Sequence, residues 1–157
     1  MDRTCKRTLL VDFHHFPQIP LFEDVDEELV VGWMVHRPQR GVRAGERLIQ
    51  RDRLAEQAFL LLEGELMVHL DSSPAYDLGS VSPGDCVGEV STLCGIPATA
   101  NVSAAADSVV CEVPRDELMA WSRQSHQFAL NLISLMGHRL RTSNRLLSDE
   151  QHSQEQF

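Results

Sequence analysis

Basic residues are scarce in this 157-residue chain, which carries 14 Lys and Arg against 23 Asp and Glu and has a formal net charge of -9. No Lys or Arg occurs between Arg53 and Arg115. A surface of this sign repels polyanions at long range, and the few basic residues are scattered among acids instead of gathered on one face. The composition therefore argues against nucleic acid as a direct partner.

Long apolar runs and cysteine pairs are also lacking. The N-terminal run "TLLVDF" is too short for a signal peptide or a membrane span, so we expect a cytoplasmic protein with no membrane partner. The neighbouring His14 and His15 have no third ligand at a suitable spacing, and we expect no metal site. Without a CxxC pair, the cysteines are expected to be reduced thiols that mostly pack in the core. They are Cys5, Cys86, Cys94 and Cys111.

The period of the apolar pattern changes along the chain. Residues 23–35 predict a short amphipathic helix that carries Trp33 and Met34 on one face. From residue 37 to 114, brief β-rich runs are cut by glycine and proline turns, which predicts an antiparallel barrel or sandwich. Gly64 separates two of these strands, where a bulge or tight turn needs a residue without a side chain.

Helical periodicity returns after Pro114. It predicts a short helix over 114–124 and a long helix over about 126–147, followed by a polar tail over 148–157 that is expected to fray. The long helix spans about 30 Å, more than one small barrel covers, so we expect part of its apolar stripe to meet another chain in a homodimer. The alternative is that the stripe folds back on its own barrel. The candidate interface residues are Leu132, Ile133, Met136, Leu140 and Leu147.

Four segments, followed by the two helices, resemble the cyclic nucleotide-binding domain family. They are "RAGERLIQ" (43–50), "FLLLEGELMV" (59–68), "SPGDCVGEVSTL" (82–93) and "GIPATANVSA" (95–104). The resemblance covers residues 21–147, after a leader over 1–20. It implies a mainly β fold: an antiparallel β-roll or jelly-roll barrel with an N-terminal helix, a short lid helix and a long C-terminal interface helix.

The resemblance also places a phosphate-binding cassette. In that family the cassette reads Phe-Gly-Glu-hydrophobic-Ala-Leu and, a few residues later, Pro-Arg-Ala. Here its glycine falls on Gly88, its ribose-binding glutamate on Glu89 and its proline on Pro97, whereas its phosphate-binding arginine falls on Ala98. A charge-assisted hydrogen bond contributes roughly 1.5 to 3 kcal/mol, so losing it should weaken cyclic nucleotide binding by about tenfold to a hundredfold or more.

A replacement cation would have to come from the long helix, through Arg139, Arg141 or Arg145, and we expect that none reaches the pocket. The family often has a glycine in the first hairpin where this chain has Arg51 and Asp52, so that turn is expected to differ locally. Ser143 and Asn144 fit the polar contact that the family's helix makes to the base, or else an exposed helix surface. The candidate ligand-binding residues are Val87, Gly88, Glu89, Val90, Pro97, Ala98, Thr99, Ser143 and Asn144.

The sequence predicts no enzymatic activity, because Cys86, Cys94 and Ser91 have no histidine and acid partners at a recognisable spacing. We expect a signalling module without a cofactor: a degenerate cyclic nucleotide-binding-like domain that acts as a regulatory or protein-docking dimer. By resemblance to domains joined to diguanylate cyclases, its protein partner would belong to bacterial second-messenger signalling.

Two other functions stay open at this point. The first is a sensor that binds cyclic AMP, cyclic GMP, cyclic di-GMP or another small ligand in the β-roll pocket. The second is the sensor part of a transcription regulator, whose DNA-reading helix-turn-helix would follow the long helix. The ten polar residues after Leu147 contain no such element, which disfavours the second function.

Overall fold

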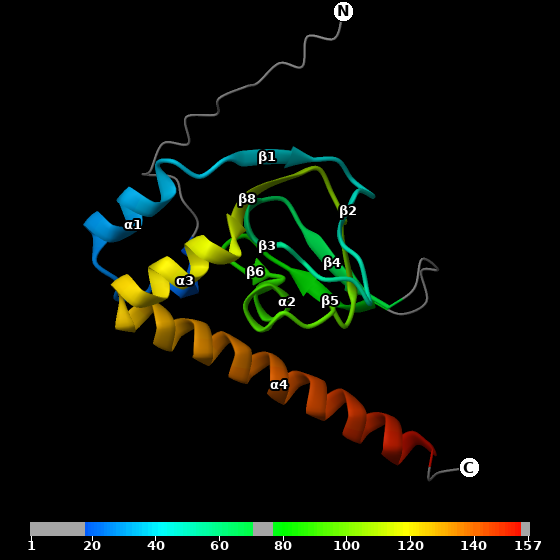
Figure 1. The fold of residues 1–157 in the computed structure, drawn as a ribbon. Helices are drawn as coiled ribbons and strands as arrows, with labels where there is room; N and C mark the ends of the chain where they lie inside the picture. Colours follow the sequence, from blue (N-terminus) through cyan, green and yellow to red (C-terminus); the bar gives the residue numbers. More distant parts are fainter. Residues whose placement is uncertain (1–17, 71–76, 155–157) are drawn as a thin grey trace, which may run out of the picture.

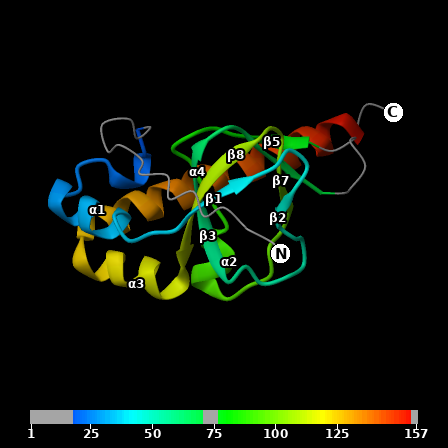
Figure 2. The same ribbon diagram turned by 90° about the horizontal axis from the view of Figure 1, so that it is seen from above.

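Two four-stranded antiparallel sheets form a β-roll in the computed structural model, which describes residues 18–70 and 77–154 (Figures 1 and 2). The sheets have the strand orders β1-β8-β3-β6 and β2-β7-β4-β5. The strands are β1 (Gln39–Val42), β2 (Arg47–Ile49), β3 (Gln57–Glu63), β4 (Leu66–His69), β5 (Asp77–Val81), β6 (Cys86–Val87), β7 (Asn101–Ala104) and β8 (Ser108–Pro114). The helices are α1 (Glu27–Met34), α2 (Glu89–Cys94), α3 (Arg115–Gln124) and α4 (His126–Gln154). This architecture confirms the predicted β-roll with flanking helices.

Strand β3 lies in the middle of the molecule and is buried on both faces. Phe59 and Leu61 point into the roll, whereas Leu60 and Leu62 point toward the helices, because successive side chains of a strand alternate between its faces. The apolar residues that fill the roll come from both sheets and form the inner cluster. They are Val42, Ile49, Phe59, Leu61, Leu66, Val81, Val87, Val102, Ala104 and Val110.

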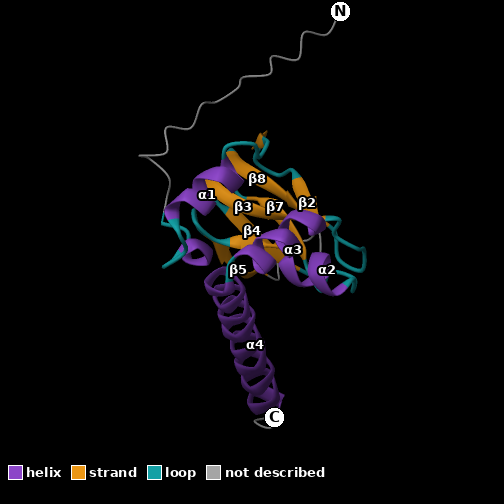
Figure 3. Cartoon of the chain, turned by 60° about the vertical axis from the view of Figure 1, so that its left-hand side comes forward, coloured by secondary structure: helices purple, strands orange, loops and turns teal. Residues whose placement is uncertain are grey.

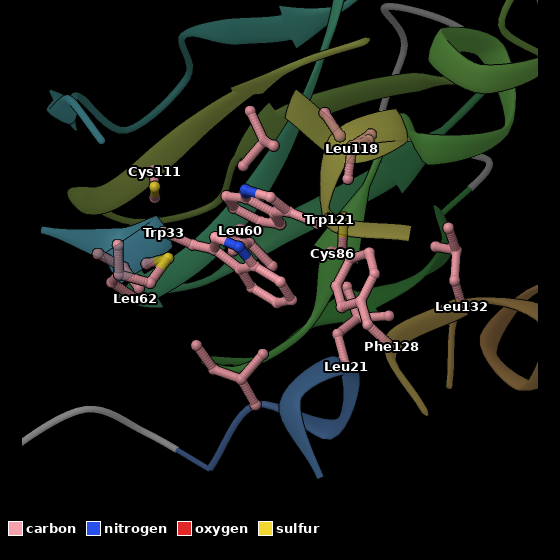
Figure 4. Packing of buried hydrophobic residues seen from close by; sticks show 14 residues of the cluster. Leu21, Trp33, Leu60, Leu62, Cys86, Cys111, Leu118, Trp121, Phe128 and Leu132 are labelled. Atoms are coloured by element: carbon pink, nitrogen blue, oxygen red, sulfur yellow. The ribbon is translucent and has the colours of Figure 1, made fainter. Parts of the chain in front are cut away.

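An aromatic cluster joins the helices to the outer face of the β3 sheet (Figure 4). The rings of Trp33 in α1 and Trp121 in α3 are stacked, with centroids 5.0 Å apart and planes 11° apart. Phe128 of α4 meets Trp121 edge-on at 5.7 Å. The Trp33 indole N–H donates a hydrogen bond of 2.6 Å to Gln124 Oε1, which satisfies its polar group. The beginning of α4 is therefore fixed firmly to the roll.

Two turns have positive φ angles, which most residues rarely adopt. Gly64 follows β3 with φ 94°, and a Cβ there would lie 2.7 Å from the Asp107 carbonyl oxygen, so only glycine fits this close approach. In the turn after β2, Asp52 itself adopts a left-handed φ of 64°, the conformation that glycine takes most readily. The chain thus makes this turn without the expected glycine.

Helix α4 is longer than the sequence predicted. It runs from His126 to Gln154 over 29 residues, or about 43 Å at 1.5 Å per residue. No glycine or proline follows Leu147 to stop it, so residues that were expected to fray continue the helix. Its second half extends away from the two sheets (Figures 1 and 3).

Three cysteines lie in the part of the chain that the structure describes. Cys86 and Cys111 are buried free thiols, and Cys94 is an exposed free thiol, whereas Cys5 and the His14–His15 pair lie outside the described residues. Within residues 18–70 and 77–154, no group of His, Cys, Asp and Glu side chains is arranged to hold a metal ion. No helix in that part of the chain is long and apolar enough to cross a membrane.

Candidate ligand-binding cassette

The cassette begins where β6 turns directly into α2. Gly88 makes this turn with φ 81°, and a Cβ there would lie 2.8 Å from Ile49 Cδ1 and 3.3 Å from the Gln57 carbonyl oxygen. Both the backbone angle and the close approach therefore require glycine. The turn makes Glu89 the first residue of α2 and buries its side chain completely.

A cation from α4 meets this buried carboxylate. One guanidinium nitrogen of Arg139 donates to Glu89 Oε1 and the other donates to the Cys86 carbonyl oxygen. The side chain of Glu89 is 1% exposed and that of Arg139 is 37% exposed, so the pair lies at the edge of the interior. The expectation that no arginine of the long helix reaches the cassette was wrong.

The packing of α4 explains why Arg139 arrives there. Phe128 and Leu132 are buried against the body of the molecule, and Arg139 lies on the same helix face, because steps of four and seven residues return to one side of an α-helix. Anchoring the beginning of α4 thus carries Arg139 over the junction of β6 and α2. The second carboxylate oxygen of Glu89, Oε2, is buried and accepts no hydrogen bond from the described residues.

The other end of the cassette contains Ala98, where the family pattern has an arginine. Ala98 packs against the inner cluster, and its backbone pairs with the turn after β2. Its N–H donates to the Arg53 carbonyl oxygen at 2.8 Å, and the Asp52 N–H donates to the Ala98 carbonyl oxygen at 2.8 Å. The Arg53 side chain is exposed and lines, with Gln50 and other residues of this turn and its flanking strands, a cavity of about 260 Å³. Solvent screens a charge in such a position.

Hydrogen bonds close the cassette against the same turn. The Ser91 hydroxyl accepts from the Ala55 N–H at 2.9 Å and donates to the Ile96 carbonyl oxygen at 2.6 Å. The Thr92 hydroxyl donates to the Ala55 carbonyl oxygen at 3.2 Å. These contacts could not be predicted from the sequence, because nothing in the pattern of a short helix shows which distant loop will satisfy its hydroxyl groups. The Ser91 hydroxyl is therefore engaged in hydrogen bonds that hold α2 against neighbouring loop segments.

The predicted pocket residues separate into two groups. Val87 belongs to the inner cluster, and it meets Gly88 and Glu89 at the beginning of α2, with Ala98 at the far end of the cassette. The others are exposed, namely Val90, Pro97, Thr99, Ser143 and Asn144. Ser143 and Asn144 lie about one turn beyond Arg139 on α4. The structure therefore packs Val87 and Ala98 on the inner cluster, whereas the two polar residues of α4 are exposed like the outer residues of the cassette.

The environment of Cys86 suits a packed thiol and not a nucleophile. Burial raises the pKa of the Cys86 thiol well above its ordinary value, and the nearby Glu89 carboxylate raises this pKa further, against a smaller lowering by Arg139. Because the thiolate is the reactive form, a neutral buried thiol does not act as a nucleophile at neutral pH.

Comparison with known proteins relates this fold to solved structures. The chain is 24% identical to the catabolite activator protein of Thermus thermophilus over 82% of its own length and 62% of that chain, with a TM-score of 0.72. It is 21% identical to a cyclic nucleotide-binding domain from Methylobacillus flagellatus over 80% of its own length and 75% of that chain, with a TM-score of 0.69. The chain is 23% identical to the N-terminal domain of a transcriptional regulator from Streptomyces coelicolor over 80% of its own length and 91% of that chain, with a TM-score of 0.61.

Among curated proteins, none has a sequence that matches this chain. The family model for the cyclic nucleotide-binding domain matches residues 39–125, which is more than half of the chain. This match includes both sheets, the cassette with Gly88 and Ala98, and helix α3. The chain therefore belongs to the cyclic nucleotide-binding domain family.

Proposed function

We propose that this protein is a non-enzymatic regulatory or protein-docking module whose cassette no longer holds a cyclic phosphate. The observation that carries the proposal is the replacement of the cassette arginine by Ala98, which packs on the inner cluster and has no charge. A cyclic nucleotide would bring its phosphate to this end of the cassette, where none of the described residues supplies a buried cation to compensate the cost of removing the phosphate from water.

The contacts of the Arg139 side chain support the same proposal. Its guanidinium is already engaged by the Glu89 carboxylate and the Cys86 carbonyl oxygen. A buried carboxylate needs its counter-charge, so diverting Arg139 to a phosphate would leave Glu89 uncompensated. The cation that reaches the cassette therefore stabilises the protein and is not free for a ligand.

One observation favours a second candidate function, a sensor for an uncharged ligand that carries hydroxyl groups. Glu89 Oε2 is a buried acceptor without a hydrogen-bond partner among the described residues. Such an atom gains most from a donor, and a ligand hydroxyl would supply one without bringing charge to Ala98. A nucleoside has this chemistry, whereas a cyclic nucleotide adds the phosphate that the cassette lacks the charge to hold.

Isothermal titration calorimetry with five ligands separates these functions. Cyclic AMP, cyclic GMP and cyclic di-GMP are titrated into the protein, together with adenosine and guanosine. The regulatory or docking module predicts no binding of any of the five at millimolar concentration, and the second candidate predicts binding of a nucleoside alone. Micromolar or tighter binding of a cyclic mononucleotide to the unchanged protein would contradict both.

The variant Ala98→Arg tests whether the rest of the cassette is intact. Because one charge-assisted contact contributes about 1.5 to 3 kcal/mol, we expect this variant to bind cyclic AMP or cyclic GMP at least tenfold more tightly than the unchanged protein. The matched control is Thr99→Arg, which adds the same charge at an exposed neighbouring position. Equal binding by the two variants would show that general charge attraction is responsible, and would count against the proposed role of Ala98.

The setting of this module is inferred from its relatives. The three similar structures described above come from bacteria, and two of them are a catabolite activator protein and a transcriptional regulator. We infer a bacterial cytoplasmic protein that takes part in second-messenger signalling through a protein partner. The chain spans 62% of the length of the Thermus thermophilus protein. That it acts as a stand-alone module is therefore part of this proposal.

A further inference from the structure

The cavity of about 260 Å³ beside Arg53 lies where the chain crosses from one sheet to the other. Its lining comes from the end of β2, the turn after β2 and the beginning of β3, over residues 48–50, 53–57 and 59. These two strands belong to different sheets and are not neighbours in either, which leaves space between them. Sites for drug-sized ligands have roughly 300 to 1,000 Å³, so this cavity suits a smaller molecule.

The buried part of the lining is apolar. Ile49 and Phe59 are 5% and 4% exposed and belong to the inner cluster, and Leu48 packs against the same cluster. Leu54 also lines the cavity but is 60% exposed, so the chain's own packing leaves this large apolar side chain in solvent. An apolar group that enters the cavity would exchange water for contact with these side chains, which favours its binding.

The exposed part of the lining carries two charges of opposite sign. Arg53 and Glu56 are three positions apart and both exposed. Neither side chain has a hydrogen bond or an ion pair with any residue that the structure describes. A single unpaired charge is ordinary on a protein surface. Two unpaired charges of opposite sign beside one apolar cavity match a molecule that carries both a carboxylate and an ammonium group.

The turn that carries these charges is held in place by the cassette. The Ala55 N–H donates to Ser91 Oγ at 2.9 Å, and Thr92 Oγ1 donates to the Ala55 carbonyl oxygen at 3.2 Å. The Arg53 carbonyl oxygen accepts from the Ala98 N–H at 2.8 Å. A binding site whose wall is fixed in advance loses less conformational entropy when a ligand binds. The cavity is therefore prepared for a ligand, although it lies outside the cassette.

The two hydroxyl groups that hold this turn are a departure of the chain from the family pattern. Ser91 and Thr92 stand where that pattern has alanine and leucine, and both side chains are buried. Buried hydroxyl groups need hydrogen-bond partners, and here the Ala55 backbone supplies one to each. The cassette that lacks its arginine at position 98 thus has new contacts that position the neighbouring turn.

We propose that this cavity binds a free α-amino acid with an apolar side chain. The ligand carboxylate would meet the Arg53 guanidinium, its ammonium group the Glu56 carboxylate, and its side chain Leu54 and Phe59. A simple carboxylate would gain the contact with Arg53 but would be repelled by Glu56, and a simple amine would be repelled by Arg53. Only a ligand with both charges satisfies the two residues together.

This site would give a regulatory module an effector that needs no cation at position 98. Because the turn is hydrogen-bonded to α2 and to Ala98, a ligand that fixes the turn also restrains the cassette. The inference stands apart from the proposed function, since it concerns other residues and another ligand class. Failure of amino acid binding would leave the absence of cyclic nucleotide binding untouched.

A ¹H–¹⁵N NMR titration with L-phenylalanine tests the ligand. We expect saturable shifts of the amide signals of Gln50, Arg53 and Glu56, with a dissociation constant of about 1 millimolar or lower. The matched probes are 3-phenylpropanoate, which lacks the ammonium group, and 2-phenylethylamine, which lacks the carboxylate. Each should bind about fivefold more weakly, because an exposed ion pair contributes little more than that. Glycine, which lacks the apolar side chain, should not bind at the same concentrations.

Substitutions on the rim test the two charges. Arg53→Met and Glu56→Gln should each weaken L-phenylalanine binding about fivefold. The matched control is Arg51→Met, since Arg51 is exposed in the same turn but does not line the cavity, and it should leave the affinity within about twofold. All three side chains are exposed, so these variants keep the fold, which circular dichroism checks.

Ser91→Ala tests the role of the cassette in holding the site. Ser91 does not line the cavity, yet its loss frees the Ala55 N–H and should weaken L-phenylalanine binding at least threefold. The absence of saturable shifts in the unchanged protein up to about 10 millimolar L-phenylalanine would overturn the proposal. Equal binding by the two analogues that lack one charge, or equal losses in Arg51→Met and Arg53→Met, would overturn it as well.

Discussion

The role of the Glu89 side chain depends on a substitution elsewhere in the cassette. In the family pattern it accepts hydrogen bonds from a ribose hydroxyl, next to an arginine that holds the phosphate. Here the arginine position is Ala98, and the cation that reaches Glu89 comes from α4, 50 positions along the chain. The carboxylate and Arg139 therefore form a link between the roll and the helix that exists without any ligand.

Replacing Arg139 tests the strength of this link. Arg139→Met keeps the aliphatic stem but leaves the buried Glu89 carboxylate without its cation. Breaking a buried pair costs roughly 3 to 5 kcal/mol, and we expect about 3 kcal/mol here because the Arg139 side chain is 37% exposed. Urea unfolding of the unchanged protein and of Arg139→Met measures the loss. Adding Glu89→Gln should recover most of it, because the uncompensated charge is then gone.

The exposed Arg141 provides the control for that measurement. Arg141→Met removes a charge from the same helix at an exposed position and should change the free energy of unfolding by no more than about 0.5 kcal/mol. A loss of similar size in Arg139→Met and Arg141→Met would mean that the ion pair with Glu89 contributes nothing specific.

Among the elements, α4 differs most from what its sequence indicated. Its existence, its start at His126 and its apolar content follow from periodicity alone. The division of that apolar content into an inner and an outer face does not, because two stripes on one helix look like a single broad stripe until a neighbour covers one of them. Leu132 and Ile133 are adjacent in sequence, yet one is 5% exposed and the other 65%.

Gly137→Ala tests whether the chain's own packing requires a glycine inside α4. Alanine should stabilise the protein by about 0.5 to 1 kcal/mol, because a Cβ at 137 meets no atom within 4 Å and alanine is the better helix former. Urea unfolding measures this gain. A loss of stability in Gly137→Ala would contradict this expectation and show that the glycine is required at this position.

The β elements followed the sequence more closely. Gly64, predicted from the strand pattern, and Gly88, placed by the family resemblance, both have positive φ angles and close backbone approaches. The turn at Asp52 could not be predicted in this way, because an aspartate and not a glycine adopts the positive φ angle there. The short helix of the cassette and the absence of its arginine were also predicted, from the family resemblance. Its closure by Ser91 was not, because that contact joins segments 36 positions apart.

The whole molecule is strongly acidic, with a formal net charge of -9, and the buried thiols of Cys86 and Cys111 add a sensitivity to alkaline pH. Burial raises the pKa of Cys111 from its ordinary 9.0 to about 12, with Arg37 lowering and Glu112 raising that pKa less strongly. The pKa of Cys86 is raised as well, first by burial and then by Glu89. A raised thiol pKa means that the folded protein keeps a proton that the unfolded chain loses.

The stability of the protein should therefore fall as pH rises above about 9. Below pH 9 both states hold the thiol proton and its contribution is constant; between pH 9 and about 12 the unfolded state alone loses it from Cys111. Each such thiol lowers the free energy of unfolding by about 1.4 kcal/mol per pH unit in this window. Urea unfolding at several pH values measures the slope, which Cys111→Ala should reduce by that amount. An unchanged slope in Cys111→Ala would contradict this assignment.

The placement of the two tryptophans has a practical consequence for all of these measurements. Trp33 and Trp121 are the chain's only indoles, and their stacked rings lie 5.0 Å apart where α1, α3 and α4 meet. Intrinsic fluorescence therefore reports the docking of the helices, whereas far-ultraviolet circular dichroism follows the backbone of the whole chain. Recorded on the same sample, the two signals distinguish release of the helices from melting of the roll, and a shared midpoint would show that both unfold as one cooperative unit.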